Sequence, residues 1–200
     1  MCEPTSPNAA TTLPHILHPY LHPIHLMNLP LLPAALALVL AGTLPAAEPA
    51  ADFVEHISAL TSGKQGVPLK LKNGEEAATK ATFKPPVEIV IEAKTNSTNL
   101  RLSYAADYVI FNWEGNKDQL RIDGGPANGR HKAGAGLIPT NKYVTIRWLV
   151  TPRKQSISVD GQLRFEHAGD YSGIDNPVRV FPAGGSEVTV KSIKVKQLPP

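Results

Sequence analysis

Residues 155–167 constrain the fold of this chain more than any other segment. Residues 157–159 and 163–165 each alternate apolar with polar side chains, and Asp160-Gly161 stands between the two runs. Asp-Gly in this position is typical of a two-residue β-hairpin turn, in which both central residues have positive φ. The segment therefore predicts an antiparallel hairpin, with the apolar side chains of both strands on the core side.

Further alternating segments extend this pattern over most of the chain. Every second residue is apolar in 87–93, 100–104 and 144–150, whereas 107–113 is apolar on both sides and fits the middle of a sheet. Trp148 shares its side of the strand with three aliphatic residues, so we expect it in the core. The sequence predicts an all-β fold, an antiparallel two-sheet jelly-roll sandwich of about 10–12 strands.

The last expected strand changes phase. Val190 ends a series of apolar residues at even positions, and Ile193 begins a series at odd positions. Because side chains alternate strictly along a strand, one extra residue is needed to keep both series on the same face. The sequence therefore predicts a β-bulge near Lys191-Ser192.

A change in composition marks a boundary near the N-terminus. All 20 basic residues lie between Lys64 and Lys196, and none precedes them. Before that point, residues 29–44 form an uncharged apolar run with the length of a signal-peptide core, followed by small residues. We expect a signal-like or disordered segment over 1–47, a linker or short helix over 48–66, and the β-sandwich over 67–200.

This segment also predicts where the protein works. It indicates export to the periplasm, cell envelope or exterior, with no stable membrane span after processing. Met27 is an alternative true start, which would make the preceding residues an over-extended reading frame. Cys2 is the only cysteine, so the expected domain has no disulfide framework and no cysteine nucleophile.

The charge pattern argues against nucleic acid as a partner. Acids and bases are interspersed, the net charge is +3, and no run of Lys and Arg reaches the length of a nucleic-acid patch. Lys191, Lys194 and Lys196 form the densest group. They fit the solvated side of a terminal strand, where Lys discourages pairing between sheet edges.

The order of these segments carries a resemblance. A strand containing Trp148 is followed by the Ile-Ser-Val-Asp-Gly hairpin at 157–161 and by the closing strand Val-Thr-Val-Lys-Ser-Ile-Lys-Val at 188–195. Over roughly residues 83–198 the chain resembles the concanavalin A-like lectin/glucanase superfamily, in particular laminin-G-type and bacterial 3-keto-disaccharide hydrolase domains. The resemblance implies a concave sheet that faces sugar and an extracytoplasmic setting of bacterial envelope type.

The chain departs from the catalytic pattern of that superfamily. Laminarinase-type glucanases carry a strand written E-x-D-x-x-E, whereas the nearest stretch here runs from Glu88 to Glu92 with Val90 in the middle. Four strand positions separate the two Cα atoms by about 13 Å, and hydrolytic pairs need carboxyl groups about 5–10 Å apart. We therefore predict no catalytic site, with Glu88 and Glu92 as the alternative candidates.

Six residues are candidates for contact with a ligand. If Phe111 and Trp113 face the core, Asn112 and Glu114 project outward beside Arg121 of the next strand. These three residues then form either a sugar-binding group or, more simply, a Glu114–Arg121 ion pair. The glycine-rich loop 124–136 carries two further candidates, Arg130 and His131. Arg147 is the last candidate, because it precedes Trp148 in the strand and points away from the core. The predicted ligand-binding residues are Asn112, Glu114, Arg121, Arg130, His131 and Arg147.

No cofactor is expected, with calcium as the alternative. Asp170, Asp175 and Asn176 flank a glycine in one loop, and laminin-G-like domains often bind calcium at such rims. Asp and Asn also favour turns, and their spacing here matches no EF-hand.

The sequence favours an exported carbohydrate-binding or adhesion-type module whose partner is a glycan or a cell-envelope polymer. A glycoside hydrolase of the 3-keto-disaccharide type is the first alternative. A non-catalytic structural or protein-interaction module of the cell envelope is the second. The sequence leaves the sugar and the oligomeric state open.

The uncharged apolar run followed by small residues predicts that residues 1 to about 47 are removed on export. Intact-mass measurement of the protein secreted by its host should give a chain that begins near Ala47 or Glu48. A mature protein that retains Met1 would contradict this expectation.

Overall fold

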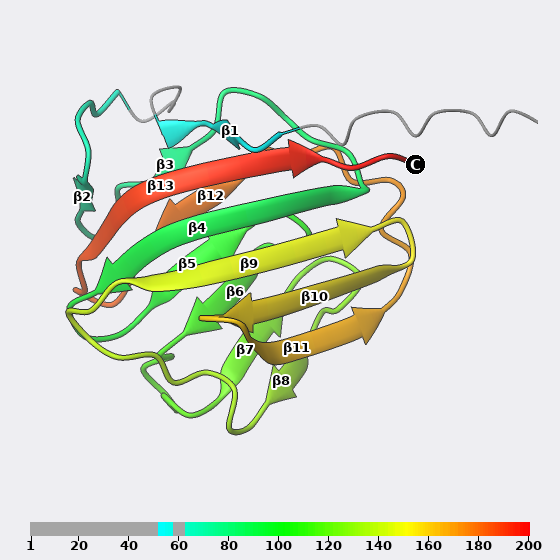
Figure 1. Ribbon diagram of the computed structural model, residues 1–200. Helices are drawn as coiled ribbons and strands as arrows, with labels where there is room; N and C mark the ends of the chain where they lie inside the picture. Colours follow the sequence, from blue (N-terminus) through cyan, green and yellow to red (C-terminus); the bar gives the residue numbers. More distant parts are fainter. Residues whose placement is uncertain (1–51, 58–62) are drawn as a thin grey trace, which may run out of the picture. The chain divides into compact units, whose positions relative to one another are not determined.

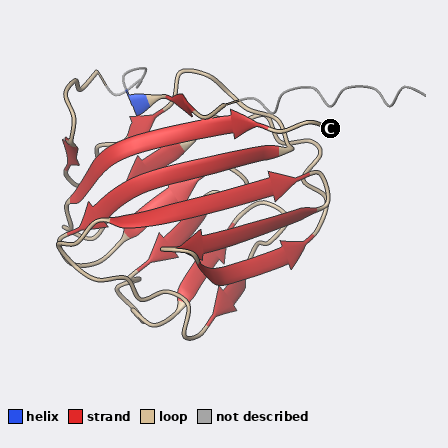
Figure 2. Cartoon of the chain, viewed as in Figure 1, coloured by secondary structure: helices blue, strands red, loops and turns tan. Residues whose placement is uncertain are grey.

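The computed structural model describes residues 52–57 and 63–200, and within them the chain forms two antiparallel sheets stacked face to face (Figure 1). Strand and loop account for nearly all of these residues, with one short helical turn at Ile57 (Figure 2). The predicted N-terminal segment and its cleavage region lie outside the described residues. No helix among the described residues is both long and apolar enough to cross a membrane.

The first sheet has seven strands in the order β1–β13–β4–β9–β10–β11, with β2 also paired to β13. These strands are β1 (Val54–Glu55), β2 (Leu69–Leu71), β4 (Val87–Thr95), β9 (Val144–Thr151), β10 (Lys154–Val159), β11 (Gln162–Ala168) and β13 (Val188–Gln197).

The second sheet has six strands in the order β3–β12–β5–β6–β7–β8. They are β3 (Ala77–Ala78), β5 (Leu100–Ser103), β6 (Tyr108–Phe111), β7 (Leu120–Asp123), β8 (Arg130–Lys132) and β12 (Arg179–Phe181). The apolar segment 107–113 supplies β6, which lies inside this sheet as predicted. The expected antiparallel jelly-roll sandwich is therefore confirmed.

Alternation along the strands builds the core between the sheets. Ile89 and Ile91 of β4 and Ile146 of β9 point inward from the first sheet, and Leu102 and Val109 point inward from the second, all with no exposed surface. The residues between them point to the outer faces and are mostly polar or charged, with Val90 and Ile110 as exceptions. Each strand thus contributes its apolar side to one shared core.

Trp148 is a core residue, as its register in β9 predicts. It is fully buried, its ring meets the edge of the Tyr104 ring at 6.0 Å between centroids, and its indole N–H donates to Gln155 Oε1 at 2.8 Å. The Tyr104 hydroxyl in turn donates to the main-chain oxygen of Phe83 at 3.1 Å, and burial raises the pKa of this phenol. Both polar aromatic groups are therefore satisfied inside the sandwich.

Two local predictions are confirmed by the backbone. Asp160 and Gly161 have φ values of 48° and 80°, as the hairpin turn between β10 and β11 requires. The pairing of β13 with β4 shifts between Val190 and Ser192, so Lys191 is the extra residue of a bulge. The bulge keeps the apolar residues on both sides of it in the core.

Within the segment expected as a linker or short helix, Val54 and Glu55 form β1, which pairs with β13 and extends the first sheet. The expectation for Leu163 is wrong, because this residue does not share the core side with Phe165. The pairing of β10 with β11 shifts between Ile157 and Ser158, which leaves Leu163 60% exposed while Phe165 is buried.

Truncation of the core indole tests this packing. We expect Trp148→Ala to lower the free energy of unfolding by about 3–5 kcal/mol, because the cavity and the unpaired Gln155 amide both remain in the folded state. Trp113→Ala is the matched control, since Trp113 is only partly buried. Urea unfolding that gives both variants the same midpoint as the parent would contradict the assigned core.

Candidate functional site

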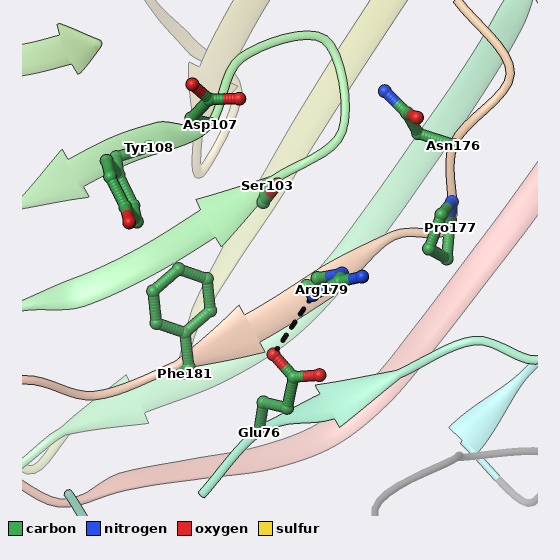
Figure 3. A pocket seen from close by; sticks show the side chains of 8 residues that line it. All are labelled: Glu76, Ser103, Asp107, Tyr108, Asn176, Pro177, Arg179 and Phe181. Carbon is green, nitrogen blue, oxygen red and sulfur yellow. Dashed lines mark ion pairs between the residues drawn. The ribbon is translucent and has the colours of Figure 1, made fainter. Parts of the chain in front are cut away.

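An open hollow of about 410 Å³ lies on the outer face of the six-stranded sheet. Leu102, Val109 and Val180 take the inward positions of β5, β6 and β12, so their neighbours in sequence point outward. Four strands or their flanks contribute side chains to the hollow (Figure 3). The residues that line it are Glu76, Ser103, Asp107, Tyr108, Asn176, Pro177, Arg179 and Phe181.

An aromatic pair forms one wall of the hollow. Tyr108 is 42% exposed, and its ring lies 6.0 Å from the Phe181 ring at an interplanar angle of 70°. The Arg101 guanidinium carbon lies 5.7 Å from the centre of the Tyr108 ring. The Arg101 guanidinium donates two hydrogen bonds to Asn99 Oδ1, which fix its position. Tyr108 thus offers an exposed ring surface next to fixed neighbours.

Polar groups surround this ring. Arg179 Nη1 lies 3.5 Å from Glu76 Oε2 (Figure 3). Asn176 Nδ2 donates to the Tyr104 main-chain oxygen at 2.9 Å, which orients the amide at the rim. The hollow therefore combines carboxylate, guanidinium, amide and hydroxyl groups with aromatic surface.

Asp107 is positioned by the turn that follows β7. Gly124 has a φ of +75°, and a Cβ at this position would collide with the Asp107 carboxyl group. The glycine therefore allows the main chain to pass directly against the carboxylate. Among the described residues, Asp107 has no ion-pair partner.

A second group of side chains lies on the same sheet face. The Arg121 guanidinium carbon lies 4.7 Å above the Trp113 ring, and Arg121 Nε lies 2.7 Å from Asp123 Oδ2. His131 Nε2 lies 3.6 Å from the other oxygen of Asp123, and its ring lies 6.2 Å from that of Trp113. Asp123 therefore connects a cation and an imidazole beside a partly buried indole.

Strand register connects this second group to the hollow. Phe181, Arg101, Ile110, Arg121 and His131 are successive partners across β12, β5, β6, β7 and β8. Four inter-strand spacings of about 4.8 Å give this row a length of about 19 Å. The outer face is thus one continuous surface rather than two separate sites.

Trp113 does not face the core, contrary to the prediction. Arg121 covers one part of the indole, and a Cβ at Gly115 would lie 2.7 Å from its Cζ2 atom, so main chain closes another part. Little of the ring surface remains for stacking. Trp113 therefore supports Arg121, while Tyr108 is the exposed aromatic group of this face.

Three predicted ligand-binding residues lie on this face, namely Glu114, Arg121 and His131. The expected ion pair between Glu114 and Arg121 is not formed. Glu114 Oε1 lies 3.6 Å from Arg101 Nη2 instead, and Arg121 pairs with Asp123. Arg130 is exposed on the edge strand β8, where it pairs in register with the core residue Ile122.

Asn112 does not project from the sheet as expected. It is fully buried with a φ of 49°, which ends the alternation of β6. Its amide accepts from Ile138 N–H at 2.9 Å and donates to the Ile138 and Ser97 oxygens at 3.0 and 3.3 Å. The side chain therefore fixes the 137–139 loop and has no free group for a ligand.

The remaining candidates on strands lie on the other sheet. Arg147 forms an ion pair with Glu88, and Lys191 Nζ lies 2.7 Å from Glu92 Oε1, which raises the pKa of this lysine. Glu88 and Glu92, the alternative catalytic candidates, are thus each paired with a cation on a neighbouring strand. The structure does not bring them to the surface that carries Arg121 and His131.

The loop candidates for calcium are held by protein groups. The Ser172 hydroxyl and N–H donate to the Asp170 carboxylate and lower its pKa. A hydrogen bond from Thr82 and the charge of Lys84 lower the pKa of Asp175. Asn176 lines the hollow instead. In the part of the chain that the structure describes, no three His, Cys, Asp or Glu side chains converge on a metal position.

Sequence reasoning missed most of the hollow. Its side chains come from β12, β5 and β6 and from the flank of β3, which the chain reaches at widely separated positions. Alternation alone could have found three of them. Arg179 and Phe181 flank the inward Val180, and Tyr108 precedes the inward Val109, so an outward position follows from the period of two.

Known structures share this fold. No protein-family model matches the chain, and no curated protein is significantly similar to it in sequence. The apo Crh5 transglycosylase superposes with a TM-score of 0.51 at 14% identity, covering 76% of this chain and 86% of that one. A Bacillus licheniformis β-glucanase gives 0.51 at 11% identity, covering 76% and 100%.

A native glycosidic hydrolase gives the same TM-score of 0.51 at 12% identity, covering 71% of this chain and 83% of that one. At these identities the likeness concerns the fold alone. It confirms the expected architecture, an antiparallel two-sheet jelly-roll sandwich.

The buried amide of Asn112 gives a testable consequence. Asn112→Asp removes the donor to two main-chain oxygens and buries a carboxylate, so we expect the free energy of unfolding to fall by about 2–4 kcal/mol. Asn141→Asp is the control, because Asn141 also has a positive φ, of 59°, but is exposed. Chemical denaturation that leaves both variants as stable as the parent would show that the amide bonds do not hold this loop.

Proposed function

We propose that the outer face of the six-stranded sheet binds carbohydrate, with the hollow at Tyr108 as the central contact. The observation that carries the proposal is an exposed aromatic ring in an open hollow whose other walls are hydrogen-bonding groups. A pyranose presents C–H surface on its ring faces and hydroxyl groups around its rim. Aromatic rings pack against the C–H surface, and amide, carboxylate and guanidinium groups form hydrogen bonds with the hydroxyl groups.

The arrangement favours binding over cleavage. Glu76 and Asp107 both line the hollow, but they flank it from β3 and β6, which are three strand spacings apart, or about 14 Å. Glu76 is also turned toward Arg179 (Figure 3). A hydrolytic pair needs carboxyl groups about 5–10 Å apart on either side of the scissile bond.

The fold is consistent with this proposal without deciding it. The solved structures that share the fold include a transglycosylase and a β-glucanase by name. A fold hosts many activities, so the side chains of the hollow, and not the likeness in fold, support carbohydrate binding. Hydrolysis of the 3-keto-disaccharide type and a purely structural envelope role are the competing functions that the experiment must separate.

Export completes the proposed role. The apolar run at 29–44 and the small residues after it support secretion or retention at the cell envelope, where a glycan or envelope polymer is available as partner. No cofactor is invoked in the proposed binding.

Replacement of the exposed ring tests the site. Tyr108→Ala should weaken glycan binding by about 1–2 kcal/mol, or roughly 5–30-fold, because an exposed aromatic anchor is lost. Tyr143→Ala is the matched control, since Tyr143 lies beside Lys94 and Lys191 of the seven-stranded sheet. A glycan array identifies a ligand, and calorimetry measures both variants.

The expected dissociation constants lie between roughly micromolar and millimolar, because an open site gains only about 0.5–1.5 kcal/mol from each hydrogen bond. Equal affinity of both tyrosine variants would place the site elsewhere. Release of shorter products from labelled oligosaccharides would favour the hydrolase. Neither binding nor cleavage across a broad panel would leave the structural module.

A further inference from the structure

We infer that the hollow at Tyr108 prefers glycans that carry free amino groups over neutral glycans, and binds glycans that carry carboxylate or sulfate groups most weakly. This inference rests on the proposed function and adds the charge class of the ligand. It follows from the charges that line the hollow, the environment of Asp107 and the two aromatic rings.

The lining of the hollow is negative although the chain as a whole is positive. Its charged members are Glu76, Asp107 and Arg179, which sum to −1, whereas the full sequence has a net charge of +3. Two nearby cations add nothing to this balance. Arg101 pairs with Glu114 at 3.6 Å, and Lys84 pairs with Asp175 at 3.5 Å.

Asp107 supplies the uncompensated charge. Arg179 faces Glu76, so the guanidinium is already matched, and Asp107 has no ion-pair partner among residues 52–57 and 63–200. The main chain at Gly124 passes directly against its carboxyl group, which limits where the side chain can swing. A protonated amine bound here would form a charge-assisted hydrogen bond, whereas a bound carboxylate would meet a like charge.

The aromatic wall supplies the contact for the sugar ring. Tyr108 and Phe181 line the hollow together with Asp107. The Arg101 guanidinium already lies 5.7 Å from the centre of the Tyr108 ring. An amino sugar can therefore place its ring against the aromatic wall and its amine against the Asp107 carboxylate.

Calorimetry with three tetrasaccharides of equal length tests the inference. One is β-1,4-linked glucosamine with free amines, one is its N-acetylated form, and one is a uronic-acid tetramer. We expect the free-amine tetramer to bind about five-fold more tightly than the N-acetylated form, and the uronate to bind most weakly. Raising the salt from about 0.1 M to about 1 M should remove the preference, because the Debye length falls from about 10 Å to about 3 Å.

Asp107→Asn identifies the group responsible. This variant should lose the preference, so that the free-amine and N-acetylated tetramers bind it with equal affinity. Asp160→Asn is the matched control, because it removes the same charge from the β10–β11 turn at the edge of the other sheet. Equal binding of all three tetramers, or tighter binding of the uronate, would overturn the inference and leave carbohydrate binding intact. Absence of binding to every tetramer and to a broad glycan array would overturn both.

Discussion

The alternation of side chains along antiparallel strands is the constraint on which the rest of this structure depends. Every strand that contributes to the shared core must present its other side to the exterior. Val180 fills the core between the sheets, and Arg179 and Phe181 consequently face outward. The same relation holds for Leu102 and its neighbours. The composition of the outer face is therefore coupled, residue by residue, to that of the core.

Register then decides which outward side chains meet. The row from Phe181 to His131 joins five strands whose order in the sheet differs from their order in the chain. Ile110 sits in the middle of this row and is 2% exposed although it points away from the core. Its neighbours Arg101 and Arg121 lie on either side of it in register. The surface is therefore packed and ordered.

The features that sequence predicts correctly are local ones. The Asp160-Gly161 turn, the bulge at Lys191 and the burial of Trp148 each follow from a few neighbouring residues. Positions at which the chain departs from strict alternation could not be predicted from the sequence pattern. Asn112 adopts a positive φ and turns its amide inward, and the register shift opposite Ile157 exposes Leu163. Both depend on contacts that the local pattern does not encode.

The candidate site could be predicted only in part for the same reason. Arg121 and Glu114 were expected to project outward from neighbouring segments, and His131 was expected in a loop, whereas His131 lies in β8. The partners of Arg121 and Glu114 also differ from those expected. Arg121 pairs with Asp123 two residues away in the same strand, and Glu114 reaches Arg101 across the sheet. The hollow itself joins segments more than 70 residues apart, because Asn176 bonds to Tyr104 at its rim. Only the sheet order brings these groups together.

The two sheets consequently present different outer surfaces. That of the seven-stranded sheet carries cross-strand ion pairs such as those of Glu88 and Glu92. That of the six-stranded sheet carries the hollow, the exposed Tyr108 ring and the Asp107 carboxylate. We propose that ligand binding belongs to the outer face of the six-stranded sheet and not to that of the seven-stranded sheet.

Mapping of a bound oligosaccharide by NMR tests this claim most directly. In a titration of the ¹⁵N-labelled domain, the account predicts that amide shifts concentrate at Ser103, Tyr108 and Arg179. The amides of Glu88, Glu92 and Arg147 should remain unchanged. Shifts that concentrate at Glu88, Glu92 and Arg147, with the amides of the hollow unchanged, would contradict the proposed site.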